Sequence, residues 1–274
     1  MTPTTADTFR STFGDLRVAL HAPPALRRWS DVKAYLKRLH TLSQERVEAE
    51  VLPYVEGIVR RGWRGDERML WTDDAIWRYI AADPGSRYSR IFSHVRVRPG
   101  AQHRLEVEDV LDGPLLTHVD HVTIVGHEHA AALLHRLLGS RHLEALRSLE
   151  ITRSDLRGLT YTRPTRRTQI ERLVFKHAGL SPDEVRKLCA IVENHGVTQL
   201  ELLCSEPLDL RSQHALLDLS LEHLTLCNAG LAESGALHRD GCKRSFGSSS
   251  LDVREHGRRL HMPAARFRDT SRIR

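Results

Sequence analysis

The best candidates for metal ligands in this sequence are four histidines that lie close together. They are His118, His121, His127 and His129. The segment that starts at His127 has the first two residues of the helical zinc motif HExxH, but Ala131 stands where the second histidine is required. The cluster contains no Cys, and a chain with 17 histidines forms such groups by chance. We therefore predict no metal and no cofactor.

Cys227 and His223 are the residues that could pair a thiol with a base. Both are expected on the outward face of one short strand, but no acid is placed to orient the histidine. The chain has no GxSxG, no Gly-rich phosphate loop and no dinucleotide fingerprint. Its four cysteines form no CxxC pair, which favours a reducing compartment. We therefore predict a protein that is not an enzyme.

The net charge of +6 is concentrated at the C-terminal end. Residues 232–274 hold ten Lys or Arg and five acids, a net +5, which leaves +1 for residues 1–231. A basic tail can hold polyanions weakly and in a salt-dependent way, so nucleic acid association through this tail is the alternative function. With 40% hydrophobic residues, no secretory leader and no apolar run near the ~20 residues of a membrane span, we expect a globular cytoplasmic protein without membrane contact.

Residues 119–231 repeat themselves, and this repetition predicts the fold. The repeated segments are Val119–Ile124, Leu146–Ile151, Ile170–Phe175, Val197–Leu202 and Leu221–Leu226. The steps between their fourth positions are 27, 24, 27 and 24 residues. Aliphatic residues at positions 1, 4 and 6 with such a period are typical of leucine-rich repeats. Each segment predicts a short strand with alternate side chains in the core.

The segments between these strands must return behind the sheet. Ser181-Pro182-Asp183-Glu184 supplies an N-cap, a first-turn proline and a capping-box glutamate, and Gly196 ends the helix that follows. A second helix is predicted over 130–138. The shorter returns, 158–169 and 209–220, have room only for a turn or two.

This pattern resembles the ribonuclease-inhibitor-like leucine-rich repeats, most clearly in residues 178–188 and 194–200. It is also similar to bacterial proteins with a short helical segment ahead of such repeats. The resemblance implies an α/β solenoid with a parallel sheet on the concave face, helices or turns on the convex face and an α-helical N-terminal cap. The chain lacks the asparagine that usually follows each strand, so the turn backbone must find other partners. The residues at those positions are His127, Ser154, Ala178, Ser205 and Ala229.

The rest of the chain divides by composition into three further parts. Residues 1–25 are expected to be poorly ordered, with at most a short helix over 9–20. Residues 26–91 form a helical domain or cap that holds all four tryptophans, and 92–231 form the solenoid. Residues 232–274 are a basic, mostly disordered tail, in which Leu251-Asp252-Val253 could form a degenerate strand 27 residues beyond Leu224.

Within the cap, helices are predicted over 31–42 with Ser30 as N-cap, over 45–61 with a kink at Pro53, and over 73–82. Residues 92–97 match the repeat template and predict a first strand. The alternative is a β-hairpin that pairs residues 93–98 with 104–107.

The outward positions of the strands form the candidate binding surface. Their mixed polarity, with Arg, His and scattered apolar groups, suits a protein partner better than a polyanion. A merely solvated face is the alternative. We predict a non-catalytic scaffold that binds an unidentified protein partner through its concave face. The predicted binding residues are His121, Thr123, Ser148, Glu150, Arg172, Val174, Lys176, Gln199, Glu201, His223 and Thr225.

Overall fold

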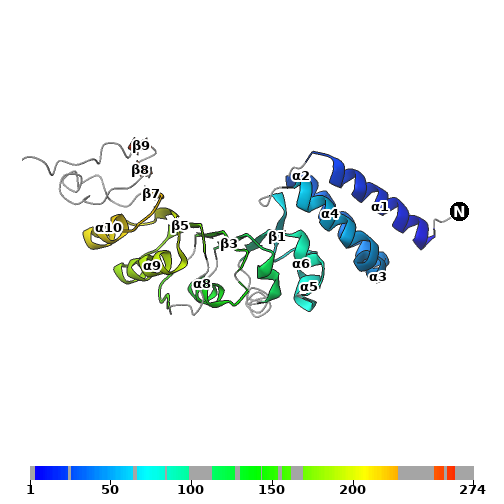
Figure 1. Cartoon of the computed structure of the whole chain (residues 1–274), viewed down its shortest axis with the longest axis horizontal. Coiled ribbons are helices and arrows are strands. Elements are labelled where there is room, and N and C mark those ends of the chain that lie inside the picture. The colour runs from blue at the N-terminus through cyan, green and yellow to red at the C-terminus, as the bar shows by residue number, and fades with distance from the viewer. Residues whose placement is uncertain are drawn as a thin grey trace, which may run out of the picture. The chain divides into compact units, whose positions relative to one another are not determined.

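The computed structural model divides the chain into two units, Met1–Val122 and Thr123–Arg274 (Figure 1). The residues that it describes are 4–23, 26–63, 67–83, 85–98, 113–126, 130–142, 144–153, 156–161, 169–227, 250–255 and 258–262. The alternative hairpin partner at 104–107 and two of the clustered histidines, His127 and His129, lie outside these residues.

The first unit consists of helices and the first strands. Its helices are α1 (Thr5–His21), α2 (Leu26–Leu42), α3 (Gln44–Arg46), a π-helical turn (Val47–Val51), α4 (Leu52–Gly62), α5 (Ala75–Ala82), α6 (Tyr88–Ile91) and a 3-10 turn (Pro114–Thr117). Its strands are β1 (Met69–Trp71) and β2 (His94–Val97), and β3 (His121–Val125) begins at its end.

The N-terminal segment corrects the expectation of a poorly ordered stretch. Helix α1 runs over seventeen residues and starts with a capping box, in which Thr4 and Asp7 satisfy each other's backbone N–H groups. Its buried side chains are Phe9, Thr12, Leu16 and Leu20. Because they recur at spacings of three and four, one face of the helix is buried against the unit. The Thr, Ala and Pro content of this segment hid that periodicity.

Two helix boundaries also differ from the prediction. Helix α2 starts at Leu26, so Ser30 lies inside it and is not the N-cap. The helix predicted over 45–61 with a kink at Pro53 is divided into α3, the π-helical turn and α4, which begins at Leu52 with Pro53 in its first turn, where proline needs no backbone donor. The π-helical turn lies just before it, and Leu52 N–H donates to Val47 O across five residues.

The predicted strand over 92–97 is present as β2, which pairs in parallel with β1. The β1 strand was not predicted: residues 26–91 were expected to form a helical domain or cap, and β1 lies between the helices predicted over 45–61 and 73–82. The outer edge of β1 is partly closed: Trp29 Nε1 donates to Met69 O at 2.9 Å. A strand edge capped in this way offers fewer free backbone groups to other chains.

A half-buried histidine and two tyrosines link α2, α5 and α6. The His40 ring stacks on Tyr79, with 3.7 Å between centroids, and His40 Nδ1 lies 3.1 Å from the Tyr88 hydroxyl. Burial lowers the pKa of His40, which the charge of Glu48 only partly offsets. Burial also raises the pKa of Tyr88, so this phenol stays protonated and can donate to a neutral His40.

The His40 contact predicts a pH dependence of stability. Since the pKa of His40 in the folded protein lies below its ordinary 6.5, the unfolded chain takes up the proton first as the pH falls. This contribution to the free energy of unfolding is therefore complete above pH 6.5 and is lost below it. Urea unfolding on both sides of this pH should show a smaller acid loss for His40→Gln than for wild type. His214→Gln, at an exposed histidine of α10, should lose as much as wild type.

The second unit alternates strands with helices. Its elements after β3 are α8 (Ala130–Gly139), β4 (Ser148–Thr152), β5 (Arg172–Ala178), α9 (Pro182–His195), β6 (Gln199–Cys204), α10 (Leu210–Leu217), β7 (His223–Cys227), β8 (Ser250–Glu255) and β9 (Arg258–Met262). Strands β4 to β8 pair in parallel in chain order, and β9 runs antiparallel to β8. Helices α9 and α10 lie on one side of this sheet (Figure 1).

The register of the sheet agrees with the repeat alignment. The leucines at the fourth position of consecutive segments are Cα partners, namely Leu149, Leu173, Leu200 and Leu224, and Leu251 of β8 follows them. The first four are buried, as are the aliphatic residues at positions 1 and 6 of the same segments. The predicted α/β class with parallel strands is confirmed. Strands β8 and β9 lie within the segment that was expected to be mostly disordered, and β8 includes the residues 251–253 of the expected degenerate strand.

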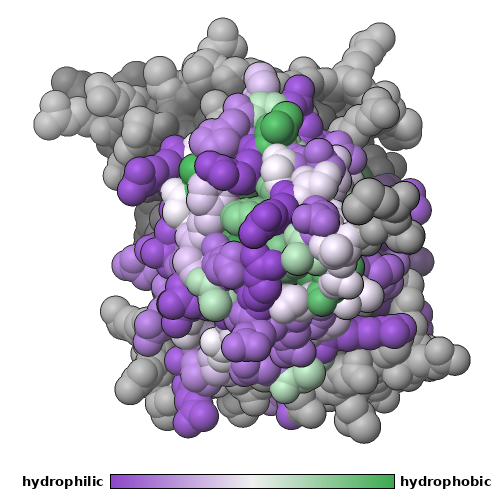
Figure 2. Space-filling model, turned by 90° about the vertical axis from the view of Figure 1, so that its right-hand side faces the viewer, coloured by the Kyte–Doolittle hydropathy of each residue, from purple (hydrophilic) through white to green (hydrophobic). Residues whose placement is uncertain are grey.

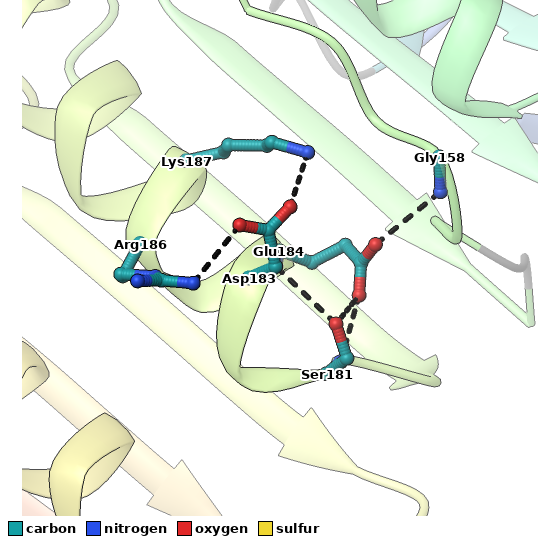
Figure 3. A network of polar contacts seen from close by, with 6 residues as sticks. All are labelled: Gly158, Ser181, Asp183, Glu184, Arg186 and Lys187. Atoms are coloured by element: carbon teal, nitrogen blue, oxygen red, sulfur yellow. Dashed lines mark hydrogen bonds and ion pairs between the residues drawn. The ribbon is translucent and has the colours of Figure 1, made fainter.

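Helix α9 forms as its sequence signals predicted. Ser181 and Glu184 make the capping box, and Gly196 ends the helix in the left-handed conformation. Glu184 also accepts a hydrogen bond from the backbone N–H of Gly158, at 3.2 Å, in the preceding return segment (Figure 3). Helix α8 matches the prediction over 130–138, and α10 occupies the short return at 209–220.

The turns after three strands satisfy their backbone without the usual asparagine. Gly126, Arg153 and His177 occupy the same position of consecutive repeat segments, and all three have positive φ. The N–H of Gly126 donates to Thr152 O and that of Arg153 to Lys176 O, both at 2.7 Å. Each of these two turns is thus hydrogen-bonded to the end of the next strand. The cost is that two residues with a Cβ adopt a conformation that favours glycine.

Candidate functional site

Two ion pairs cross the outward face of the sheet in the second unit. Arg172 Nη2 lies 3.1 Å from Glu201 Oε2, and Lys176 Nζ lies 3.1 Å from Glu150 Oε1. Each pair joins residues on adjacent strands that are offset by two positions in the register. We define the charged sheet face as these four residues together with Gln199 and His223.

Val174 occupies the centre of this arrangement. Its Cα partners are Glu150 on one side and Glu201 on the other, and Arg172 and Lys176 flank it along its own strand. The four longer side chains are joined in pairs around it, so Val174 is 0% exposed. It was predicted as an outward binding residue; it lies on the outward face of β5, but its burial leaves it no exposed surface for a partner.

Two predicted threonines are also buried and offer little surface to a partner. Thr225 lies beside His223, with its hydroxyl 2.9 Å from His223 Nε2, and Thr123 is buried in β3. In both cases a short β-branched side chain on the outward face is covered by its surroundings. Position on a strand thus predicted the face correctly but not the exposure.

A hollow of ≈ 350 Å³ opens on the charged sheet face. It is lined by Arg172, Gln199, Leu200, Glu201 and His223. Gln199 is the Cα partner of both Arg172 and His223, so three neighbouring strands contribute to it. Four of the predicted binding residues are therefore brought together here.

The remaining predicted residues lie around or apart from this hollow. Ser148 is the Cα partner of Arg172, and its hydroxyl is buried with no hydrogen-bond partner among the described residues. Glu150 and Lys176 form the second ion pair. His121 belongs to the first unit, where its ring lies 4.1 Å from that of His94.

The candidate metal and thiol residues lie only partly within the described ranges, which include His118, His121 and three of the four cysteines. Within the described ranges, no group of three or more His, Cys, Asp or Glu could hold a metal ion. Among the described residues, Cys189 and Cys204 are free cysteines. Burial raises the pKa of Cys189 and that of Cys204 to about 11, so both thiols are protonated at neutral pH and are poor nucleophiles. In the part of the chain that the structure describes, no helix has the length and apolar character to cross a membrane.

Sequence reasoning missed one group of residues, on β1 and β2 of the first unit. Trp71 and Arg96 are Cα partners there, as are Met69 and His94. The available signal was spacing, because Leu70 lies 25 residues before Val95, close to the repeat period. This spacing was not recognised, because the segment lies between two predicted helices in the part of the chain expected to form a helical cap.

Comparison of the chain with family models, curated proteins and solved structures found no match.

Proposed function

We propose that this protein is a non-catalytic scaffold of the leucine-rich-repeat kind, which binds a protein partner on its charged sheet face. The aligned leucines of consecutive parallel strands support the repeat interpretation. In such repeats a single unit cannot bury its own apolar side, so a continuous core forms only across neighbours. The outward side is then left for recognition.

The main support for the proposal comes from the two ion pairs beside the hollow. Arg172, Glu201, Lys176 and Glu150 alternate in sign across three strands, and rigid strands hold their backbones. Exposed or half-exposed ion pairs contribute little to stability, so stability alone gives little reason for this arrangement. Alternating charge beside a polar hollow suits the mixed rim of a protein interface and sets partner specificity.

The test is reversal of one ion pair. Arg172→Glu combined with Glu201→Arg restores an ion pair within the protein but inverts the charge pattern that a partner meets. We expect the affinity for the partner recovered by cross-linking and mass spectrometry to fall by at least about tenfold. Isothermal titration with the purified partner measures this, and the melting temperature checks that the variant is folded.

A matched control reverses an ion pair elsewhere. Arg46→Glu with Glu50→Arg inverts the exposed pair on the first unit, whose nitrogen and oxygen atoms are 3.0 Å apart. This control should bind as wild type does. Equal affinity of wild type and the sheet-face variant would show that the partner binds another surface.

A further inference from the structure

Two arginines lie over the ring of Trp71 on the strands of the first unit. The guanidinium carbons of Arg96 and Arg98 are 4.5 Å and 3.9 Å from the ring centroid. Trp71 and Arg96 are Cα partners, and Met69 and His94 are the partners two residues earlier. Since residues two apart in a strand share a face, these side chains lie on one face of the strand pair. We call Trp71, Arg96 and Arg98 the tryptophan–arginine platform.

The platform is held in place by hydrogen bonds. Trp71 N–H donates to Asp74 Oδ2 at 3.1 Å, and Lys33 forms an ion pair with the same carboxylate. Arg98 N–H donates to the hydroxyl of Thr72, also at 3.1 Å. A group fixed in this way loses little conformational freedom when it binds a ligand.

The two arginines differ in how their charge is satisfied. Arg98 forms an ion pair with Asp73 at 2.7 Å. Among the described residues Arg96 has no acidic partner, and its Nε is buried without a hydrogen-bond partner. A buried donor of this kind costs free energy until an acceptor reaches it. The guanidinium of Arg96 is therefore held over the tryptophan ring, but its hydrogen-bonding capacity is not fully satisfied.

We propose that the tryptophan–arginine platform binds an acidic segment of a protein, with Arg96 donating to a side-chain carboxylate. Because Nε of Arg96 is buried, its two Nη groups are the donors that a carboxylate can meet, and their planar fork matches the two carboxylate oxygens. The platform belongs to the first unit and lies apart in sequence from the charged sheet face. It goes beyond the proposed function and does not depend on it.

Nucleic acid fits this site less well than an acidic peptide. Bases bind proteins by stacking on free aromatic faces, whereas two guanidinium groups already lie over Trp71. A phosphate backbone also requires a row of cations, and Asp73 offsets one of the two charges here. On the side of α1 and α4, the described surface is mostly hydrophilic, with a few hydrophobic residues between (Figure 2).

The experiment measures binding of a fluorescent hexaglutamate peptide with an amidated C-terminus to the full-length protein at low salt. In fluorescence anisotropy, Arg96→Gln should bind about tenfold more weakly, because a hydrogen-bonded charge is lost. Arg96→Lys keeps the positive charge but not the planar pair of donors, so its affinity for hexaglutamate should lie between those of wild type and Arg96→Gln. The matched control is Arg78→Gln, at an exposed arginine of α5, and should bind as wild type does. Circular dichroism confirms that each variant is folded.

This proposal would be overturned if the wild-type protein failed to bind hexaglutamate or if Arg96→Gln left binding unchanged. It would also be overturned if Arg96→Gln weakened the binding of oligothymidylate more than that of hexaglutamate at equal salt. A neutral peptide with a free C-terminus tests whether the site binds a terminal carboxylate instead of side-chain carboxylates. If this peptide bound as tightly as hexaglutamate, the proposal would also be contradicted. Reversal of the Arg172–Glu201 pair should leave hexaglutamate binding unchanged, so the two proposals can fail separately.

Discussion

Leu200→Ala is expected to lower the free energy of unfolding by ~2 to 5 kcal/mol. Leu200 is 0% exposed and lies between its Cα partners Leu173 and Leu224. The shorter side chain leaves a cavity that the neighbouring strands cannot close, because each is held by its own backbone pairings. Since no repeat segment has a core of its own, the loss is felt by the segments on both sides.

Urea unfolding with Leu210→Ala as control isolates the effect of burial. Leu210 is 60% exposed at the start of α10, so the same substitution there should change the free energy of unfolding by less than about 0.5 kcal/mol. Equal urea midpoints for Leu200→Ala and Leu210→Ala would show that Leu200 is not a core residue. The aligned leucines would then not explain the stability of the fold.

Glu184→Ala should lower the free energy of unfolding by on the order of 2 kcal/mol. The carboxylate accepts hydrogen bonds from the N–H groups of Ser181, at 2.9 Å, and Gly158, at 3.2 Å, as well as from the Ser181 hydroxyl (Figure 3). The residue is only 5% exposed, so its removal leaves two backbone donors without this acceptor. The start of α9 and the return segment before β5 would both loosen.

Glu193→Ala, at an exposed glutamate of the same helix, is the control and should change stability by less than about 0.5 kcal/mol. The pH supplies a second check. Burial by itself raises the pKa of Glu184, but the hydrogen bonds from Ser181 and Gly158 outweigh it and hold the pKa below its ordinary value. The stabilisation is therefore present at neutral pH and lost as the pH falls through the folded-state pKa. A difference between wild type and Glu184→Ala that stays constant into acid would contradict this role.

The regular elements of the second unit were predictable because their signals are local. The capping box at Ser181, the glycine at 196 and the periodic leucines each specify structure within a few residues. The first unit was harder. Met69–Trp71 is too short to show a strand period, and it becomes a strand only because β2 lies beside it. A strand that depends on tertiary pairing in this way cannot be predicted from the sequence of the segment itself.

The candidate site was predictable as a set of positions but not as a set of contacts. Alternation along the strands placed Arg172, Glu201 and Gln199 on one face, and the structure brings them around one hollow. Each ion pair forms because the two side chains are long enough to meet across adjacent strands at positions offset by two residues. The burial of Val174 between the two pairs depends on the same side-chain lengths. These outcomes depend on the lengths of neighbouring side chains, which a single-strand pattern does not contain.

The pairing of each strand from β4 to β8 with its sequence neighbour has a consequence for how such a chain can change over time. In the leucine-rich-repeat arrangement proposed for this chain, a strand and its return segment interact mainly with the copies before and after them. Duplication or loss of one such stretch of DNA would lengthen or shorten the stack while leaving every other neighbour relation intact. The number of copies can therefore vary among descendants far more readily than the residues that make each copy fit the next.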